Sequence, residues 1–393
     1  GGAAVGRPAA PGLAASAPGT EYAAFPTDDG EPILRRDDVV LRHLFVWNDE
    51  DLPSILRLPP EWSDSLSPSS VRRVSAGPSS EVFLASLRTD PSVEVAVKKM
   101  ETNSPALQRE LNVRRRLDVL HRSGFAPSAQ VVPMLAFEVF DSASYFLMPA
   151  CEITLKRLAD SQRRKLPEEP GEPLLTPELA LVVIVDVLRG LRNLEEAGIL
   201  HNALHEGNIM VRETQAFIID FSQACLALED DSGRKRAEFL GGEERLSSRL
   251  SPYRTAPEVV GGVPTGHANS VWSAGLILAR LALGYVPTMP EREWYAIDRE
   301  EPGEWDPTEA ERIRRRIARE FDIKRSPGFG AAPGYIQELL EGMLEKDEAR
   351  RLTAEQALRI AEKAADDIGV IVPPELSLPQ RLPEGSRQRP VSW

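Results

Sequence analysis

Cysteines, long apolar runs and basic clusters are scarce in this sequence, and each scarcity excludes a class of protein. The chain has 2 cysteines, Cys151 and Cys225, which excludes a disulfide-rich framework and a four-cysteine zinc site. The most apolar stretch, residues 179–188, is shorter than the roughly 18 residues that a membrane span needs and contains Asp186, so we expect a soluble chain without a transmembrane segment. The 60 acidic against 47 basic residues give a formal charge of -13, which argues against a nucleic acid partner.

The rest of the composition is that of a globular protein with a low-complexity start. Hydrophobic residues make up 42% and charged residues 27% of the 393 residues, which fits about two domains or one large bilobal domain. Residues 1–31 are rich in Gly, Ala, Pro and Ser, so we expect a disordered linker or tag. Residues 32–70 are expected to form an N-terminal extension that packs on the next lobe. Its amphipathic helix at 33–45 has an alternative role, peripheral membrane contact through its arginines.

The apolar pattern changes along the rest of the chain from strand-like to helix-like. Residues 71–150 predict a small lobe of short strands with one helix at 105–121. Residues 151–372 predict a larger helical lobe, and residues 373–393 a C-terminal tail. The expected strands span residues 71–74, 82–87, 93–99, 131–139, 145–148, 209–212 and 216–219. The expected helices of the large lobe span residues 177–197, 270–283, 309–321, 333–344 and 353–368. The fold class is therefore α+β, with two lobes.

A series of short motifs runs through both lobes in a specific order. The expected strand over residues 93–99 carries Lys98 in the pattern VAVK, and an ammonium group on a strand can hold phosphate oxygens. Downstream come HNALHEGNI at 201–209, DFS at 220–222 and APE at 256–258. VWSAG at 271–275 and DEARRLT at 347–353 complete the series. In order and spacing the chain resembles the eukaryotic protein kinase domain from residue 71 to about residue 368. The resemblance implies a bilobal kinase-like fold.

The resemblance also assigns roles to individual residues. Lys98 looks like the strand lysine that contacts the α- and β-phosphates of ATP, with Glu110 on the following helix as its ion-pair partner. Asp220 and Asn208 look like the two ligands of the Mg²⁺ or Mn²⁺ ions. An alternative for Asp220 is a structural turn aspartate capped by local N–H groups.

Two further residues and one departure follow from the same resemblance. Glu258 and Arg351 look like the buried ion pair that ties the activation segment to the large lobe. Arg114 lies one helical turn after Glu110, where kinases place an apolar residue. This departure implies that the helix is displaced or that the assignment of Glu110 is off.

The pattern breaks at the positions that perform the chemistry. Within the His201-Asn202-Ala203 tripeptide, Ala203 occupies the place of the aspartate that accepts the proton of the substrate hydroxyl, and a methyl group is not a base. Of the three glycines of the phosphate loop only Gly77 remains, and the Pro78 beside it has no N–H group for a phosphate. We therefore expect ATP binding to be weak or absent.

Other positions in the same region carry smaller changes or substitute groups. Ser222 replaces the third residue of the DFG motif, and Ser270 replaces an aspartate that braces the catalytic loop. His205 and Glu206 are the alternative bases, although charged residues in such a loop are more often solvated.

A closer resemblance concerns the apicomplexan rhoptry kinase family. It rests on the N-terminal extension, on the hinge FLMP at 146–149 and on the degenerate phosphate loop. That family contains many pseudokinases that are secreted and bind other proteins. The resemblance implies a secreted chain in the parasitophorous vacuole or the cyst wall, with parasite or host proteins as partners. Family geometry also implies that Cys151 and Cys225 stay free thiols.

These observations lead to one hypothesis and two alternatives. The leading hypothesis is a pseudokinase that is not an enzyme, requires no cofactor and acts as a protein-binding scaffold or allosteric regulator. The first alternative is an atypical Ser/Thr phosphotransferase that uses Lys98, Asp220 and Asn208 with a substitute base. The second is a switch that binds ATP without transferring phosphate. Residues 163–175 and the activation segment at 220–258 are either solvated loops or docking surfaces.

Overall fold

The computed structural model describes residues 66 to 372 of the chain. The gaps in this range are residues 68–69, 77–79, 89, 123–129, 141–142, 164–171, 213–214, 230–234, 238–250, 260–265 and 291–304. The expected linker at 1–31, the helix at 33–45 and the tail at 373–393 lie outside the described residues. So do Gly77 and residues 230–234 and 238–250 of the activation segment, and the expectations for them stay predictions.

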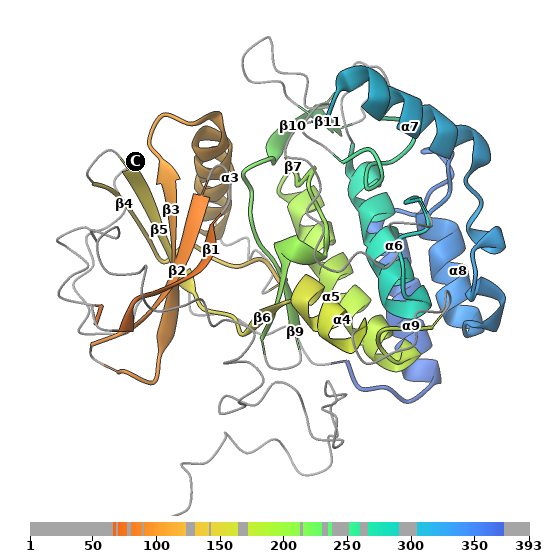
Figure 1. Ribbon diagram of the computed structural model, residues 1–393, viewed down its shortest axis with the longest axis horizontal. Helices are drawn as coiled ribbons and strands as arrows, with labels where there is room; N and C mark the ends of the chain where they lie inside the picture. Colours follow the sequence, from red (N-terminus) through yellow and green to blue (C-terminus); the bar gives the residue numbers. More distant parts are fainter. Residues whose placement is uncertain are drawn as a thin grey trace, which may run out of the picture.

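The described residues form two lobes, a small one built on a sheet and a larger helical one (Figure 1). This arrangement confirms the α+β fold that the sequence predicts. The elements of the small lobe are β1 (Arg72–Ala76), β2 (Ser80–Ser86), β3 (Glu94–Glu101), α3 (Pro105–Arg122), β4 (Ala136–Phe140) and β5 (Ala143–Pro149). Its sheet has the order β1-β2-β3-β5-β4, and all neighbouring strands are antiparallel.

The two-residue period of the central strands decides what each face of this sheet carries. Val95 and Val97 of β3 lie on one face, in an apolar cluster with Leu147 of β5. Lys98 follows Val97 directly, so its side chain lies on the opposite face, where it is paired in register with Phe146. Helix α3 packs its apolar residues on that second face, against Phe146. The alternation thus directs the Lys98 side chain toward α3.

The large lobe begins after β5 and is mostly helical. Its strands and short helical turns are β6 (Ile153–Thr154), β7 (Ile199–Leu200), η3 (Glu206–Asn208), β8 (Ile209–Arg212), β9 (Gln215–Ile218), β10 (Cys225–Glu229), β11 (Lys235–Ala237), η6 (Ile323–Arg325) and η7 (Phe329–Ala331). Its helices are α4 (Leu155–Arg163), α5 (Pro177–Glu196), α6 (His267–Leu283), α7 (Pro307–Glu320), α8 (Gly334–Met343) and α9 (Ala354–Asp367). Helices α5 and α6 form the centre of the main apolar core, where Trp272 is fully buried.

One expected strand is shorter than its sequence pattern indicates. The apolar run at 131–139 predicts a continuous strand, but β4 begins only at Ala136. The start of the run pairs with the other lobe instead, because Val132 N–H donates to the Ile218 carbonyl and Val131 bridges Ile218. This segment therefore connects the small sheet to β9 of the large lobe.

Two expectations based on scarcity can be compared with the described residues. Within that part of the chain, no helix is long and apolar enough to cross a membrane. Cys151 and Cys225 are both buried and are not joined to each other. Burial raises the pKa of the Cys151 thiol to about 12, so this thiol stays protonated at neutral pH.

Candidate active site

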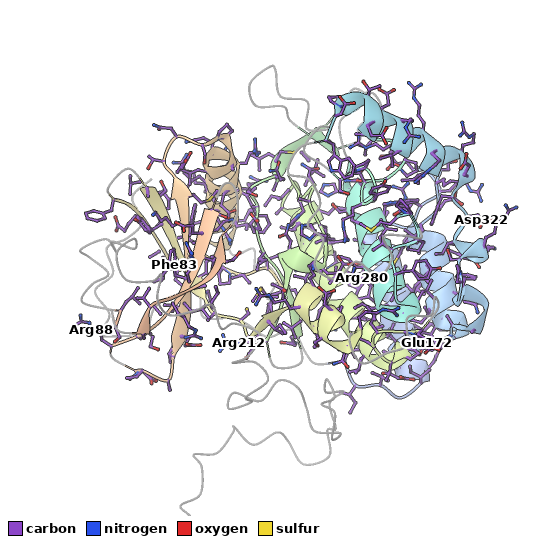
Figure 2. All side chains as sticks on the ribbon, in the orientation of Figure 1. Phe83, Arg88, Glu172, Arg212, Arg280 and Asp322 are labelled. Carbon is purple, nitrogen blue, oxygen red and sulfur yellow. The ribbon has the colours of Figure 1, made fainter. Side chains whose placement is uncertain are left out.

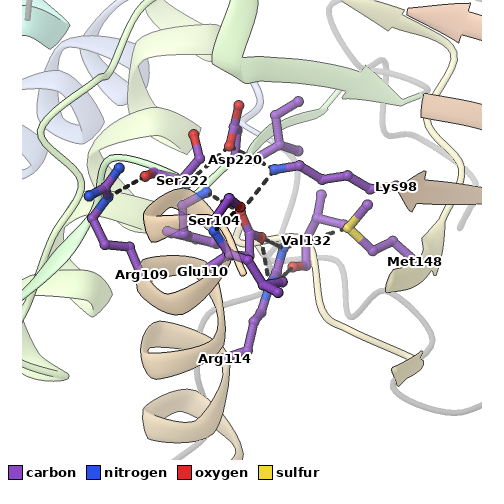
Figure 3. Close-up of polar contacts among 12 residues, drawn as sticks. Lys98, Ser104, Arg109, Glu110, Arg114, Val132, Met148, Asp220 and Ser222 are labelled. Carbon is purple, nitrogen blue, oxygen red and sulfur yellow. Dashed lines mark hydrogen bonds and ion pairs between the residues drawn. The ribbon is translucent and has the colours of Figure 1, made fainter. Parts of the chain in front are cut away.

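Lys98, Glu110 and Asp220 form a buried charge cluster where the two lobes meet (Figure 3). Lys98 Nζ donates to Glu110 Oε2 at 2.9 Å and to Asp220 Oδ1 at 2.8 Å. Lys98 comes from β3, Glu110 from α3 and Asp220 from the segment that follows β9. The Lys98–Glu110 pair that the resemblance implies is therefore formed, with Arg114 present. Helix α3 is not displaced, contrary to one of the two readings of Arg114.

Lys98 and Asp220 hold each other in their ionised forms. Burial alone would lower the pKa of Lys98, but the carboxylates of Asp220 and Glu110 outweigh it and raise that pKa. Burial would raise the pKa of Asp220, but Lys98 and the Ser222 N–H hold it far below its ordinary value. The Asp220 side chain remains 30% exposed, whereas that of Lys98 is 6% exposed. A negative oxygen and a positive nitrogen are thus available to a phosphate with a divalent cation.

Asp220 lies in a strained turn whose three residues are each held by another element. Asp220 has φ of 63°, in the left-handed region that side chains other than glycine rarely adopt. The Phe221 N–H donates to Glu110 Oε2 at 2.9 Å. Arg109 Nε of α3 donates to the Ser222 carbonyl at 2.6 Å. Of the two readings of Asp220, the local cap is present, since Ser222 N–H donates to Oδ1 at 3.1 Å, and it coexists with the Lys98 bond.

The loop at 201–208 approaches this turn from the other side. His201 Nε2 lies 2.9 Å from the Ile219 carbonyl, and burial lowers the pKa of its ring. Asn202 also has φ of 63°, and its amide donates to the Gln223 carbonyl at 3.1 Å. Asn202 and Asp220 are the only residues other than glycine with a left-handed backbone among the described residues, and both lie at this site. Ala203 is partly exposed and places a methyl group where a carboxylate base would stand.

Asn208 is the second residue that fits a divalent cation. Its side-chain nitrogen donates to the Ala203 carbonyl at 2.8 Å, which leaves Oδ1 as the atom that can act as a ligand. Its backbone carbonyl accepts from the N–H of Ile219 at 3.0 Å, directly before Asp220. The donor set of two oxygens suits Mg²⁺ or Mn²⁺ completed by phosphate oxygens and water. No group of three or more His, Cys, Asp or Glu that could hold a metal occurs among the described residues.

Glu206 and His205 differ from the solvated residues that the sequence favours. Glu206 is 1% exposed, and Arg254 Nη1 donates to its Oε2 at 2.7 Å. Burial would raise the pKa of Glu206, but Arg254 and Arg280 outweigh it and hold that pKa at about 2. His205 Nδ1 accepts from the Gly207 N–H at 3.0 Å, and burial and the Arg254 charge lower its pKa to about 4. Neither group is placed or tuned to act as a base near neutral pH.

Glu206 and Arg254 belong to a second charge cluster, which also includes Arg280 of α6 (labelled in Figure 2). Arg280 Nη2 pairs with Asp160 of α4, and its Nε lies 3.6 Å from Glu206 Oε1. Ser273 Oγ of α6 donates to the Arg254 carbonyl at 2.9 Å. The catalytic loop is therefore braced through Glu206. Sequence reasoning missed this cluster, because its members Glu206, Arg254, Arg280 and Asp160 lie far apart in the chain.

The remaining expected site residues fall into two groups. Glu258 and Arg351 form a two-pronged ion pair, with Nη1 to Oε1 at 2.6 Å and Nη2 to Oε2 at 2.8 Å. Arg351 also stacks over Trp272, 5.1 Å from the ring centroid, so this pair has the structural role that the resemblance implies. Gly77 lies outside the described residues, and nothing tests its role in phosphate binding.

A model of the protein kinase domain family matches residues 69–361. A probable serine/threonine-protein kinase of Encephalitozoon cuniculi is 27% identical over 46% of this chain and 25% of its own length. A mitogen-activated protein kinase of Caenorhabditis elegans is 30% identical over 47% of this chain and 48% of its own length. A probable serine/threonine-protein kinase of Corynebacterium efficiens is 28% identical over 54% of this chain and 30% of its own length.

The comparisons support the resemblance to the protein kinase domain and correct the expectation about enzyme activity. The sequence led us to expect that the chain is not an enzyme. That expectation is wrong, because the family match and the relatives named as serine/threonine kinases point to a kinase. The chain spans less than half the length of each of these three relatives. Since the family model covers residues 69–361 of the 393, this chain belongs to the protein kinase domain family.

Proposed function

We propose that this chain is an ATP-dependent serine/threonine protein phosphotransferase that works without a carboxylate base in its catalytic loop. The observation that carries the proposal is the assembled cluster of Lys98, Glu110 and Asp220. An ion-paired lysine on β3 and an ionised aspartate at the lobe junction are the groups that a nucleoside triphosphate and its divalent cation require. Asn208 supplies a further ligand oxygen beside them.

The missing base makes phosphoryl transfer by such an enzyme slower but does not prevent it. Phosphoryl transfer passes through a loose transition state, so catalysis comes mainly from positioning and from neutralising charge. A general base typically contributes about 10²- to 10⁴-fold. ATP bound with Mg²⁺ or Mn²⁺ would supply the phosphoryl group. Lys98 would hold its α- and β-phosphate oxygens, Asp220 and Asn208 would hold the metal, and the hydroxyl proton would pass to water rather than to residue 203.

Transfer and binding of ATP test this proposal together. We expect the full chain to incorporate labelled γ-phosphate into itself or a basic protein acceptor, slowly and only with a divalent cation. Lys98→Met and Asp220→Asn should abolish incorporation, while the surface variant Lys363→Met should not change it. In calorimetry, ATP at 100 times its Kd should stabilise the fold by about 2.7 kcal/mol. Absence of both ATP-dependent stabilisation and phosphate incorporation would overturn the proposal. Stabilisation by ATP without phosphate incorporation would indicate the ATP-binding switch instead.

We further propose that the chain binds other proteins and belongs among the rhoptry kinases, secreted to the vacuole or cyst wall. The support is its sequence resemblance, which rests on the N-terminal extension, the hinge at 146–149 that ends with Pro149, and the degenerate phosphate loop. Binding of a partner would then survive Lys98→Met, whereas phosphotransfer would not. If partner capture from parasite or host extract were lost with Lys98→Met, the binding role would depend on the nucleotide site.

A further inference from the structure

Arg114 is a second buried cation beside the Lys98 cluster, and nothing in the proposed chemistry uses it. It lies on α3, is 3% exposed, and reaches Glu110 Oε1 with Nε at 3.2 Å and Nη2 at 3.1 Å (Figure 3). Its Nη1 donates to the Val132 carbonyl, and its Nη2 lies 3.6 Å from the sulfur of Met148 at the end of β5. Its guanidinium carbon lies 4.8 Å from the ring centroid of Phe221.

These contacts divide the carboxylate of Glu110 between two partners. Arg114 binds Oε1, while Oε2 accepts from Lys98 Nζ and from the Phe221 N–H, each at 2.9 Å. Arg114 and Lys98 together balance the charges of Glu110 and Asp220. A buried carboxylate that loses one of its cations is strongly destabilised, so the cluster depends on both. The planar fork of an arginine suits this role because it can bind two oxygens and a ring face at once.

The position of Arg114 also lets it contact three parts of the fold at once. Through Glu110 it acts within α3, through Val132 on the segment that crosses between the lobes, and through Phe221 on the turn that carries Asp220. Lys98 is shared between two carboxylates, those of Glu110 and Asp220. When a phosphate draws Lys98 toward itself, Arg114 is the cation that stays on Glu110.

We propose that Arg114 is a positioning residue that holds α3 and the turn at 220–222 together in the nucleotide-free protein. Glu110 therefore keeps its place when Lys98 turns from Asp220 toward a phosphate. The first part of this inference stands on the contacts of the free protein. The second part rests on the proposed function, since it requires that ATP binds at Lys98.

Amide hydrogen exchange at Phe221 tests the first part without nucleotide. The Phe221 N–H is bonded to Glu110 Oε2, so it reports directly whether Glu110 is in place. In the full chain we expect Arg114→Leu, which keeps apolar volume, to speed exchange at Phe221 by about tenfold or more, as loss of about 1.4 kcal/mol of local protection would. Arg114→Lys should give an intermediate rate, because it keeps the charge but not the fork.

Arg116→Leu is the matched control. Arg116 is on the same helix and is exposed, and its Nε donates to the Ala197 carbonyl of the large lobe at 3.0 Å without touching Glu110. It should leave exchange at Phe221 as in the wild type. If Arg114→Leu does not fold, Arg114→Lys decides alone. Wild-type protection of Phe221 in Arg114→Lys, or in a folded Arg114→Leu, would overturn the inference.

ATP titration with Mg²⁺ tests the second part and separates it from the proposed function. If the wild type binds ATP, Arg114→Leu should raise the Kd about tenfold while Arg116→Leu does not change it. Equal affinity of wild type and Arg114→Leu would overturn the positioning role toward nucleotide and leave the proposed function standing. A wild type that does not bind ATP would overturn the proposed function, and the exchange rates would still decide whether Arg114 positions α3.

Discussion

Arg254 Nη1 donates to Glu206 Oε2 at 2.7 Å, and this bond ties the segment directly before residues 256–258 to the catalytic loop. Glu206 has no route to solvent, since it is 1% exposed and has Arg280 on its other side. A buried carboxylate between two arginines stabilises the fold only while it is ionised. The pair therefore links the integrity of the catalytic loop to pH.

Glu206 should make the protein sensitive to strong acid. Its pKa in the fold is about 2, below its ordinary value of 4.5, so its contribution is complete above pH 4.5 and is lost as pH falls through about 2. This difference corresponds to about 3 kcal/mol of unfolding free energy. Glu206→Gln should destabilise the protein at neutral pH and flatten the acid part of its urea-unfolding profile. Glu309→Gln, which breaks an exposed pair with Arg312, is the control and should change neither. An unchanged acid profile in Glu206→Gln would contradict the assignment.

His205 should give a second pH dependence at higher pH. Burial and the charge of Arg254 lower its pKa from 6.5 to about 4, although the carboxylates of Glu206 and Asp220 oppose this shift. Because the fold prefers the neutral ring, stability is complete above pH 6.5 and falls as pH drops toward 4. His205→Asn, which can still accept from the Gly207 N–H, should remove this slope. An NMR titration of the ring measures the pKa directly, and a midpoint near 6.5 would refute the prediction.

Ala203→Asp should restore a base where the catalytic loop lacks one. If positioning by Lys98 and Asp220 is intact, the turnover rate should rise by about 10²- to 10⁴-fold with little change in the KM for ATP. Steady-state phosphotransfer on one acceptor protein measures both constants. Ala203→Asn is the control, because it has a similar shape but is not a base. A rate as low in Ala203→Asp as in Ala203→Asn would show that something other than the base limits transfer.

Arg351 and Glu258 should behave as a unit in unfolding experiments. Arg351→Leu leaves Glu258 without its ion-pair partner, removes the stacking on Trp272, and should cost about 3 to 5 kcal/mol of unfolding free energy. The double variant with Glu258→Leu should recover part of this loss, since no buried charge then lacks a partner. Urea titrations of the two single variants and the double variant form the cycle. Strict additivity would indicate that the pair contributes no interaction energy.

Thr353 caps helix α9 and offers a small, clean test of local stability. Its side chain accepts from the N–H of Gln356, whose side chain in turn accepts from the N–H of Thr353. Thr353→Ala should lower the unfolding free energy by about 1 kcal/mol, and Thr353→Ser should be close to the wild type. Thermal or urea unfolding is sufficient to measure the difference. Equal stability of the Ala and Ser variants would mean that the cap contributes nothing here.

The elements that the sequence predicts well are those whose pattern is local. The run from Pro105 shows its apolar positions at helical spacing, and α3 occupies Pro105–Arg122 as expected within one residue. Lys98 and Glu110 could be paired in advance because the resemblance to the protein kinase domain implies this pair, and the bond is formed. The strand pair at 209–212 and 216–219 also forms, as β8 and β9.

What the sequence did not predict depends on partners far along the chain. The short strands β7 and β10 pair with each other across 25 positions, from Leu200 to Cys225, and neither has a pattern long enough to be seen alone. Helix α4 follows a two-residue strand and was missed for the same reason. Glu206 and Arg114 are charged residues in the interior, and only their distant partners make that burial favourable.

The two buried thiols make this protein convenient for site-specific labelling. Cys151 and Cys225 are 8% and 6% exposed, and they are the only cysteines of the sequence. A thiol reagent that needs solvent access should therefore leave the native protein almost unmodified. A cysteine placed at Val119, which is 57% exposed on α3, would be the one accessible thiol, and a fluorophore attached there would report how that helix moves.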